Sequence, residues 1–132
     1  MKKTLNDLVA EANAQVTTYA PEEAMQRVSA PDVQFVDVRD NLEMLSEGHI
    51  PGSIHAPRGL LEFFIDPQSP YHKPVFASGK TLIFYCKSGG RSALAAQRAR
   101  EMGLDAVAHI AGGFTAWKQN GGPVAEQPEM AL

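Results

Sequence analysis

Residues 82–94 read LIFYCKSGGRSAL, which combines an apolar run, a glycine-containing loop and the beginning of a helix. The apolar run predicts a buried strand, and the loop opens with Cys86, the single cysteine of the chain. A helix N-terminus leaves backbone N–H groups without partners and carries roughly half a positive elementary charge. Such a helix end stabilises an anion placed just before it. The order of strand, loop and helix therefore predicts that Cys86 is held as a thiolate.

The residues of the loop strengthen this prediction. Gly89 and Gly90 permit successive N–H groups to turn inward and form an anion-binding nest, and Lys87 and Arg91 place positive charge beside Cys86. Thiols in such surroundings have pKa values in the range of roughly 3.5 to 7.5, against about 8.5 for an ordinary cysteine. We therefore expect a nucleophile. The alternative is a small apolar side chain buried at the end of a strand, which is common for free cysteines.

Composition limits the classes of protein that fit. With 132 residues, of which 44% are hydrophobic, the chain suits a single domain with one core. A net charge of −3 argues against general binding to nucleic acids or membrane surfaces. One cysteine excludes an intrachain disulfide and a thiol-based structural zinc site, which favours a reducing compartment, the cytoplasm. Polar residues interrupt the first 17 positions, so we expect neither a signal peptide nor a membrane span there.

Apolar runs and segments with helical spacing alternate along the chain, which predicts an α/β fold with a mostly parallel sheet and helices on both faces. Proline and glycine make residues 66–80 an irregular surface loop. Strands are predicted over 33–37, 53–56, 82–85 and 106–110, and helices over 5–16, from 21 onward, over 41–47 and 59–66, from the Cys86 loop to 103, and over 114–119.

Three motifs in one order carry a resemblance to a known family. The segment FVDVR at 35–39, followed by Glu43 and by GHIPGSI at 48–54, resembles the amino-terminal signature of rhodanese domains. The segment GGFTAW at 112–117 resembles their carboxyl-terminal signature, and the Cys86 loop lies between the two. This resemblance implies a central sheet of about five strands. It covers about residues 18–124, which leaves 1–17 as an N-terminal helical extension and 125–132 as a flexible tail.

The resemblance implies a sulfurtransferase. The loop cysteine of the family takes the outer sulfur of an anionic donor such as thiosulfate, becomes a persulfide and passes that sulfur to cyanide, a thiol or a partner protein. Cys86 stands at the position of this nucleophile, and the chemistry requires neither a metal nor an organic cofactor. The oligomeric state stays open. The residues expected to bind the donor, through backbone N–H groups and cationic side chains, are Lys87, Ser88, Gly89, Gly90, Arg91 and Ser92.

Two alternatives remain beside sulfur transfer. Phosphatase and arsenate-reductase relatives of the family use a loop of seven residues, whereas Cys86 to Arg91 counts six, so loop length favours sulfur transfer. An arginine at the closing position fits either chemistry, since a guanidinium binds any oxyanion. The second alternative is a rhodanese module that has lost catalysis and only binds partners, and the presence of Cys86 with both glycines argues against it.

Other notable residues receive structural interpretations. In the family, Asp37 and Arg39 tie the first signature to the rest of the fold. Trp117 is expected in the core, and Arg58 either contacts the donor or lies in solvent. The histidines lack the spacing of a metal site, so hydrogen-bonding roles are expected for His49, His55, His72 and His109. The phenylalanines expected either in the core or around a pocket or partner surface are Phe63, Phe64 and Phe76.

Overall fold

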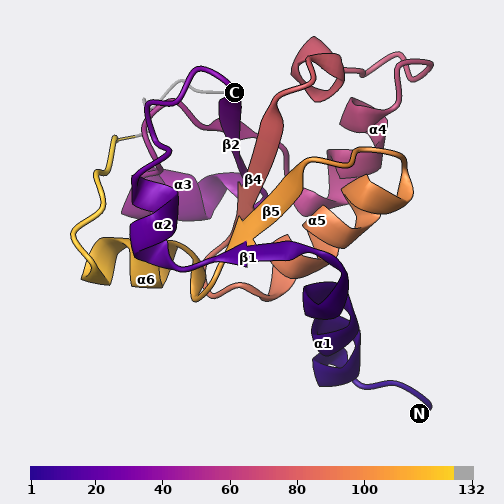
Figure 1. Cartoon of the computed structure of the whole chain (residues 1–132), viewed down its shortest axis with the longest axis horizontal. Helices are drawn as coiled ribbons and strands as arrows, with labels where there is room; N and C mark the ends of the chain where they lie inside the picture. The colour runs from indigo at the N-terminus through magenta and orange to yellow at the C-terminus, as the bar shows by residue number, and fades with distance from the viewer. Residues whose placement is uncertain (127–132) are drawn as a thin grey trace.

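The computed structural model describes residues 1–126, which form a five-stranded sheet in the order β1-β5-β4-β2-β3 with every pairing parallel (Figure 1). The predicted α/β class and parallel sheet are confirmed. Sequence patterns indicated four of these strands, and the edge strand β1 was not foreseen. The strands are β1 (Thr17–Tyr19), β2 (Val33–Asp37), β3 (Ile54–His55), β4 (Thr81–Tyr85) and β5 (Val107–Ile110).

Helices cover both faces of the sheet, as expected (Figure 1). The helices α2 and α6 pack on one face, and α4 and α5 pack on the other. Residues 66–80, predicted as irregular, contain one short 3-10 helix. The helices are α1 (Leu5–Gln15), α2 (Pro21–Met25), α3 (Asn41–Glu47), α4 (Leu61–Ile65), α5 (Gly90–Glu101) and α6 (Gly113–Gln119), and the 3-10 helices are η1 (Arg58–Leu60) and η2 (Pro74–Ala77).

The alternation of side chains along β4 decides which helix each residue meets. Leu82, Phe84 and Cys86 pack on the face covered by α5, whereas Ile83 and Tyr85 pack on the face covered by α6. The inner face of α5 is made of alanines and one serine, so this helix lies close to the sheet. Cys86, directly after the last residue of β4, therefore points toward the first turn of α5.

The N-terminal segment is attached to the rest of the fold at two places. β1 pairs in parallel with β5, and Arg100 Nη1 of α5 donates a hydrogen bond of 2.7 Å to the carbonyl of Gln15 at the end of α1. Ala12 of α1 is fully buried, although most of this helix projects from the body (Figure 1). The first helix thus lies against the helix that follows the Cys86 loop.

The segment after α6 is held against the body as far as Ala125. Trp117 Nε1 donates to the carbonyl of Pro123 at 2.8 Å. Ala125 exchanges two backbone hydrogen bonds of 2.8 and 2.9 Å with His49. These contacts fix the chain as far as Ala125, and residues 127–132 of the predicted tail lie outside the described part of the chain.

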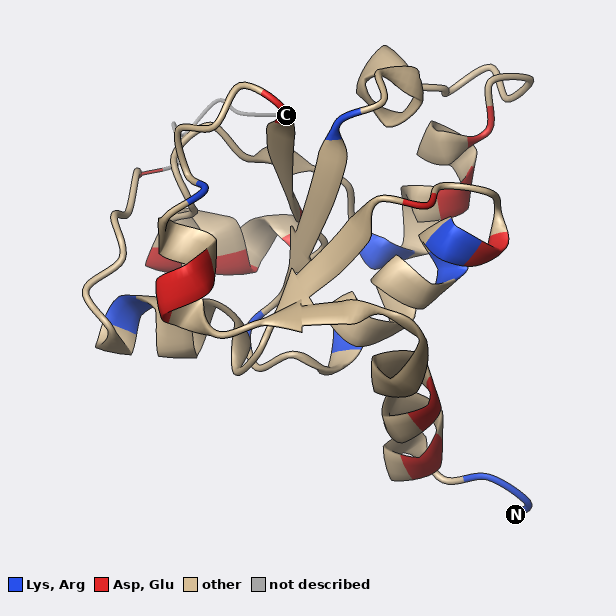
Figure 2. Ribbon diagram, viewed as in Figure 1, with Lys and Arg blue, Asp and Glu red and all other residues tan. Residues whose placement is uncertain are grey.

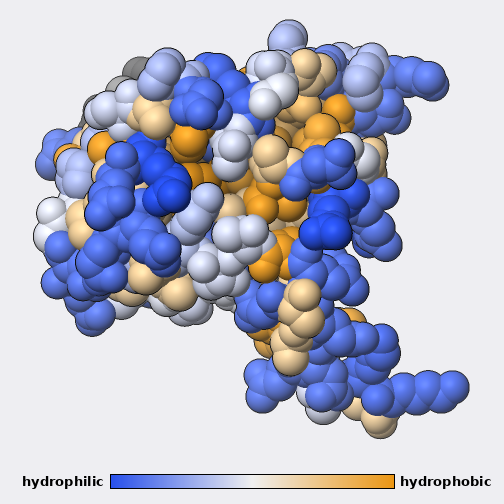
Figure 3. Space-filling view, viewed as in Figure 1, coloured by the Kyte–Doolittle hydropathy of each residue, from blue (hydrophilic) through white to orange (hydrophobic). Residues whose placement is uncertain are grey.

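Basic and acidic residues are interspersed along the ribbon (Figure 2). Near the last turn of α5, Arg98 forms ion pairs with Glu62 at 3.2 Å and with Glu101 at 2.9 Å. Apolar surface lies on the right of the view, above the projecting α1 (Figure 3). Phe76 and Met102 line a hollow of about 400 Å³. No helix within residues 1–126 is long and apolar enough to cross a membrane.

Candidate active site

The Cys86 sulfur lies at the centre of the loop that joins β4 to α5. The backbone N–H of Gly89 donates to Cys86 Sγ at 3.1 Å, and that of Ser92 donates at 3.4 Å. These donors stabilise negative charge on the sulfur, and an apolar cysteine would not require them. The exposed fraction of Cys86 is 1%, so a reagent has to reach the sulfur through the loop. Lys87 and Ser88, in contrast, are exposed.

The two adjacent glycines of the loop have different conformations, which the sequence did not separate. Gly89 has φ +110°, in the left-handed region that favours glycine. Gly90 is the first residue of α5 and has no positive φ. A Cβ atom at Gly90 would have Val9 as its nearest neighbour, at 4.0 Å, which is an ordinary contact distance. The loop therefore requires glycine at residue 89 and tolerates a side chain at residue 90.

The first turn of α6 donates two backbone hydrogen bonds to the loop. Phe114 N donates to the carbonyl of Cys86 at 2.7 Å, and Thr115 N donates to that of Lys87 at 3.1 Å. A Cβ atom on Gly113, where φ is +61°, would lie 2.6 Å from backbone atoms of Cys86 and Lys87. Sequence reasoning placed Gly113 only in the carboxyl-terminal motif and missed this contact, because it joins segments distant in sequence.

Both cations of the loop face carboxylates of α3. Arg91 donates to both oxygens of Glu43, at 2.7 and 2.9 Å, and Lys87 Nζ lies 3.7 Å from Glu47. The hydrogen bonds from Arg91 lower the pKa of Glu43 to about 2, and the same contact raises the pKa of Arg91. The sequence indicated Glu43 only as part of the amino-terminal motif and gave it no role of its own. In the structure its carboxylate accepts two hydrogen bonds from the guanidinium of Arg91, the group expected to bind the donor.

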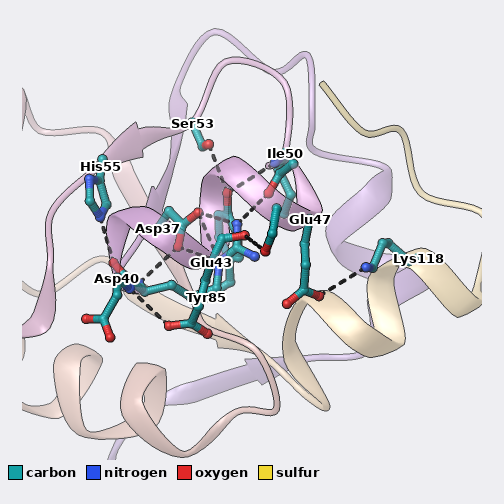
Figure 4. A network of polar contacts seen from close by, with 12 residues as sticks. Asp37, Asp40, Glu43, Glu47, Ile50, Ser53, His55, Tyr85 and Lys118 are labelled. Carbon is teal, nitrogen blue, oxygen red and sulfur yellow. Dashed lines mark hydrogen bonds and ion pairs between the residues drawn. The ribbon is translucent and has the colours of Figure 1, made fainter. Parts of the chain in front are cut away.

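A buried ion pair fixes the segment that carries Glu43 (Figure 4). Arg39 Nη2 donates to Asp37 at 2.7 Å and to the carbonyl of Gly48 at 2.7 Å, and both charged side chains are fully buried. Burial alone would lower the pKa of Arg39, but the hydrogen bonds and charge of Asp37 outweigh it and the pKa is raised. The guanidinium also stacks 4.5 Å from the ring centroid of Phe114. This pair has the structural position that the sequence resemblance implied.

The side chain of Tyr85 connects β4 to the segment after α3 (Figure 4). Its hydroxyl accepts from the backbone N–H of Ile50 at 3.1 Å and lies 2.9 Å from Ser53 Oγ. Lys118 of α6 reaches Glu47 at 3.2 Å on the outer side. Tyr85 thus holds the end of β4 to the segment that follows α3, and Lys118 holds α6 to α3.

A chain of polar side chains leads from the sulfur toward the N-terminal segment. Ser92 Oγ lies 3.6 Å from Cys86 Sγ and 3.0 Å from His109 Nδ1. His109 Nε2 lies 2.7 Å from Asn13 Oδ1 of α1 and 3.2 Å from Thr18 Oγ1 of β1. Burial lowers the pKa of His109 to about 4. This arrangement was missed; the available signal was alternation in β5, which puts His109 on the α5 face.

A hollow of about 270 Å³ lies beside the loop, between α1 and the sheet edge. Val9 and Asn13 line it from α1, and His109 lines it from β5. Ser88 and Gly89 supply its third wall. The N-terminal segment thus forms part of the surroundings of the site.

The remaining candidate residues have other contacts. Arg58 pairs with Glu62 at 3.1 Å. Phe76 is buried and Phe63 is half exposed, and both line hollows that Met102 also lines, at the end of α5 opposite the loop. Trp117 is fully buried, as expected.

The chain is similar to several known proteins. A model of the rhodanese-like domain matches residues 20–120. The chain is 37% identical over 109 residues to an uncharacterized protein of Synechocystis, covering 83% of this chain and 56% of that relative. It is 35% identical over 95 residues to the thiosulfate sulfurtransferase GlpE of Shewanella oneidensis, covering 72% of this chain and 85% of the relative.

A solved structure from Rhodopseudomonas palustris, a protein of unknown function and possible tyrosine phosphatase, is also similar. It is 47% identical, with a TM-score of 0.92, and the match covers 95% of this chain and 96% of the other. The chain spans little more than half of the cyanobacterial relative, at 56% of its length. The family model extends over most of the sequence and includes the Cys86 loop, and the chain belongs to the family of rhodanese-like domains.

Proposed function

We propose that the protein is a sulfurtransferase that carries sulfur as a persulfide on Cys86. The observation that carries the proposal is the contact of two backbone N–H groups, those of Gly89 and Ser92, with Cys86 Sγ at the beginning of α5. They favour first the thiolate and then the partial negative charge that develops during sulfur transfer. The similarity to a thiosulfate sulfurtransferase supports the same chemistry.

The reaction has two steps. The Cys86 thiolate attacks the outer sulfur of thiosulfate, a new S–S bond forms, and the original S–S bond breaks. Sulfite leaves with the electron pair of that bond, and Cys86 becomes a persulfide. A nucleophilic acceptor, either cyanide or a thiolate of a small molecule or partner protein, then attacks the outer sulfur and restores the Cys86 thiolate.

The loop binds the anionic donor. The exposed backbone and side chains of Lys87 and Ser88 face the incoming anion, and Gly89, Gly90, Arg91 and Ser92 complete the loop. Because Glu43 and Glu47 face the two cations, the positive charge available to the donor is smaller than the sequence alone suggests. We infer that backbone N–H groups contribute most of the recognition. A thiol-dependent mechanism with one cysteine suits a reducing compartment such as the cytoplasm.

The same contacts disfavour phosphate-ester hydrolysis, the function considered for the relative from Rhodopseudomonas palustris. A cysteine phosphatase requires a guanidinium that binds the phosphate oxygens and an acid that protonates the leaving group. Arg91 is bound to Glu43 through two hydrogen bonds, and the lowered pKa of Glu43, about 2, keeps this carboxyl ionised at neutral pH. Neither group is free for the phosphatase role.

Steady-state assays test the proposal. The protein is incubated with thiosulfate and cyanide, and thiocyanate is measured; a parallel assay supplies an aryl phosphate. We expect thiocyanate formation that is lost in Cys86→Ser, since the hydroxyl is not ionised at neutral pH. Circular dichroism of the variant checks that the fold is kept. Aryl phosphate turnover without thiocyanate formation would refute the proposal.

A further inference from the structure

Four side chains, one from the Cys86 loop and three from α5, β5 and α1, form a continuous hydrogen-bonded path that begins at the sulfur. The path runs from Cys86 to Ser92 of α5, from there to His109 of β5, and ends at Asn13 of α1. Its distances are 3.6, 3.0 and 2.7 Å. A role for this path rests on the proposed function, because only a cysteine that reacts as a thiolate requires a path for its proton.

The contacts of His109 determine where its ring hydrogen lies. Thr18 Oγ1 donates to Asn13 Oδ1 at 3.5 Å, and His109 Nε2 faces both of these oxygens. Asn13 Oδ1 is an acceptor, so Nε2 carries the hydrogen of the neutral ring. Nδ1 therefore presents its lone pair to Ser92 Oγ at 3.0 Å. The carbonyl of Gly89 is a second acceptor for the Ser92 hydroxyl, at 3.3 Å, and the relay uses the hydroxyl orientation in which Ser92 donates to His109. The remaining lone pairs of Ser92 Oγ accept the S–H of Cys86.

We propose that Ser92 and His109 form a proton relay that removes the thiol proton of Cys86, with Asn13 and Thr18 of the N-terminal segment holding His109 in the receiving tautomer. The S–H bond breaks as Ser92 Oγ takes the proton, and the former hydroxyl hydrogen moves to His109 Nδ1. The S–H electron pair stays on sulfur. The products are a thiolate that accepts the Ser92 hydroxyl and an imidazolium that donates to Ser92 and Asn13.

The surroundings of His109 agree with a base that is neutral at rest. The groups that face it within residues 1–126 are Ser92 from α5, Asn13 from α1 and Thr18 from β1, none of which is charged, and Cys86 lies beyond Ser92. Burial keeps its pKa below the usual range. A neutral ring has a free lone pair to accept the proton, and because burial disfavours the imidazolium, the ring becomes charged only as the Cys86 thiolate forms beyond Ser92. His109 does not touch the donor and acts through Ser92, which makes it a positioning residue.

In this proposal the N-terminal segment, which contains α1 and β1, takes part in the chemistry of the site. Asn13 and Thr18 lie before residue 20, where the match to the family begins. Both residues are exposed, so they add little to the core. Their contact with His109 Nε2 connects an element outside the shared domain to the reacting cysteine.

Asn13→Asp tests the relay because it keeps the acceptor and adds a negative charge. If the relay operates, the carboxylate stabilises the imidazolium and the thiolate fraction at about pH 6 rises roughly three- to tenfold, the effect of half to one pKa unit. If no relay exists, the same carboxylate acts only through space and lowers the thiolate fraction, since like charges repel. The change in the thiolate fraction of Cys86 therefore has opposite signs with and without the relay.

Thiolate absorbance in the ultraviolet, measured against pH with Cys86→Ser as background, reports the single cysteine without requiring sulfur transfer. Ser92→Ala, which removes only the hydroxyl, is combined with Asn13→Asp; we expect the rise to disappear. Gln15→Glu is the matched control, because it adds a carboxylate to α1 that faces Gln97 instead of His109. We expect no rise in this control, and thermal unfolding verifies the fold of each variant.

A fall or no change in Asn13→Asp, a rise that survives Ser92→Ala, or an equal rise in Gln15→Glu would each overturn the relay. The relay and the proposed function fail separately. If the thiolate fraction rises as expected but thiosulfate leaves no sulfur on Cys86, the relay stands and the sulfurtransferase does not. If sulfur is transferred but the thiolate fraction does not rise, the reverse holds.

Discussion

At the scale of single residues, two neighbouring glycines illustrate how position decides function. Gly89 occupies the left-handed region with φ +110°, and its N–H donates to Cys86 Sγ at 3.1 Å. Gly90 already belongs to α5 and has space around it. The sequence treats them as one pair, whereas the backbone requires only the first.

Gly89→Ala and Gly90→Ala form a matched pair. Alanine at residue 89 is strained by its positive φ, by roughly 1–2 kcal/mol, and displaces the N–H from the sulfur, so sulfur transfer falls at least tenfold. Alanine at residue 90 leaves activity unchanged and raises the free energy of unfolding by about 0.4–1 kcal/mol, because the unfolded chain loses freedom. Thiosulfate kinetics and urea unfolding measure both. Equal losses in the two variants would contradict this account of the loop.

The carboxylate of Glu43 competes with the donor for Arg91. Glu43→Gln keeps an acceptor for the backbone N–H of Asp40 but removes the negative charge. We expect the Michaelis constant for thiosulfate to fall, because the guanidinium is released and a repelling charge is lost, and the effect weakens at high salt. Leu42→Gln, on the exposed side of the same helix, serves as control. An unchanged or higher Michaelis constant would show that Glu43 positions Arg91 for the donor instead.

At the scale of elements, the site depends on two helix beginnings that meet at one loop. The first turn of α5 provides donors to the sulfur, and the first turn of α6 provides donors to the carbonyls of Cys86 and Lys87. The loop is thus held on both sides by backbone groups. Its shape depends on how closely α6 approaches.

Gly113→Ala tests this approach. The added Cβ would lie 2.6 Å from backbone atoms of Cys86 and Lys87 at a φ of +61°. We expect a loss of about 2–4 kcal/mol in the free energy of unfolding, the range of strongly destabilising substitutions that combine overpacking with backbone strain. Urea unfolding measures it. Gly121→Ala, which also has a positive φ (+79°) but open space, separates backbone strain from the clash. A similar loss in both variants would show that φ alone matters.

Local patterns predicted most elements, and the exceptions share a cause. Strands β2, β4 and β5 were recognisable as apolar runs, and α5 as a small-residue helix after the loop. β1, with the sequence Thr-Thr-Tyr, has no apolar run; it is a strand because it pairs with β5 about ninety residues later. The pairing of Arg91 with Glu43 and the path through His109 are likewise non-local. Cys86 and its loop were predictable because strand, loop and helix are contiguous.

At the scale of the whole molecule, buried and paired ionisable groups make stability depend on pH. The pKa of His109 is lowered to about 4 from the ordinary 6.5, and that of Glu43 to about 2 from the ordinary 4.5. In each case the unfolded chain binds the proton at a higher pH than the folded chain. Acid therefore favours unfolding in both ranges.

We expect the free energy of unfolding to fall as the pH decreases from about 6.5 to 4 through His109, with a further contribution from His49, whose pKa burial also lowers. A second fall follows from about 4.5 to 2 through Glu43. His109→Gln should flatten the upper range and leave the lower one. Urea unfolding at a series of pH values provides the measurement. A wild-type stability that is level between pH 6.5 and 4 would contradict the burial of a neutral His109.

The central claim is that the enclosed sulfur of Cys86 accepts a second sulfur and gives it up. Intact-mass spectrometry after incubation with thiosulfate measures this directly. We predict a mass increase of one sulfur atom, located on the peptide containing Cys86, absent from Cys86→Ser and removed by cyanide. An alkylating reagent tests in parallel whether Cys86 of the folded protein is accessible. The account would be contradicted if the mass stayed unchanged and Cys86 reacted with the reagent only after unfolding.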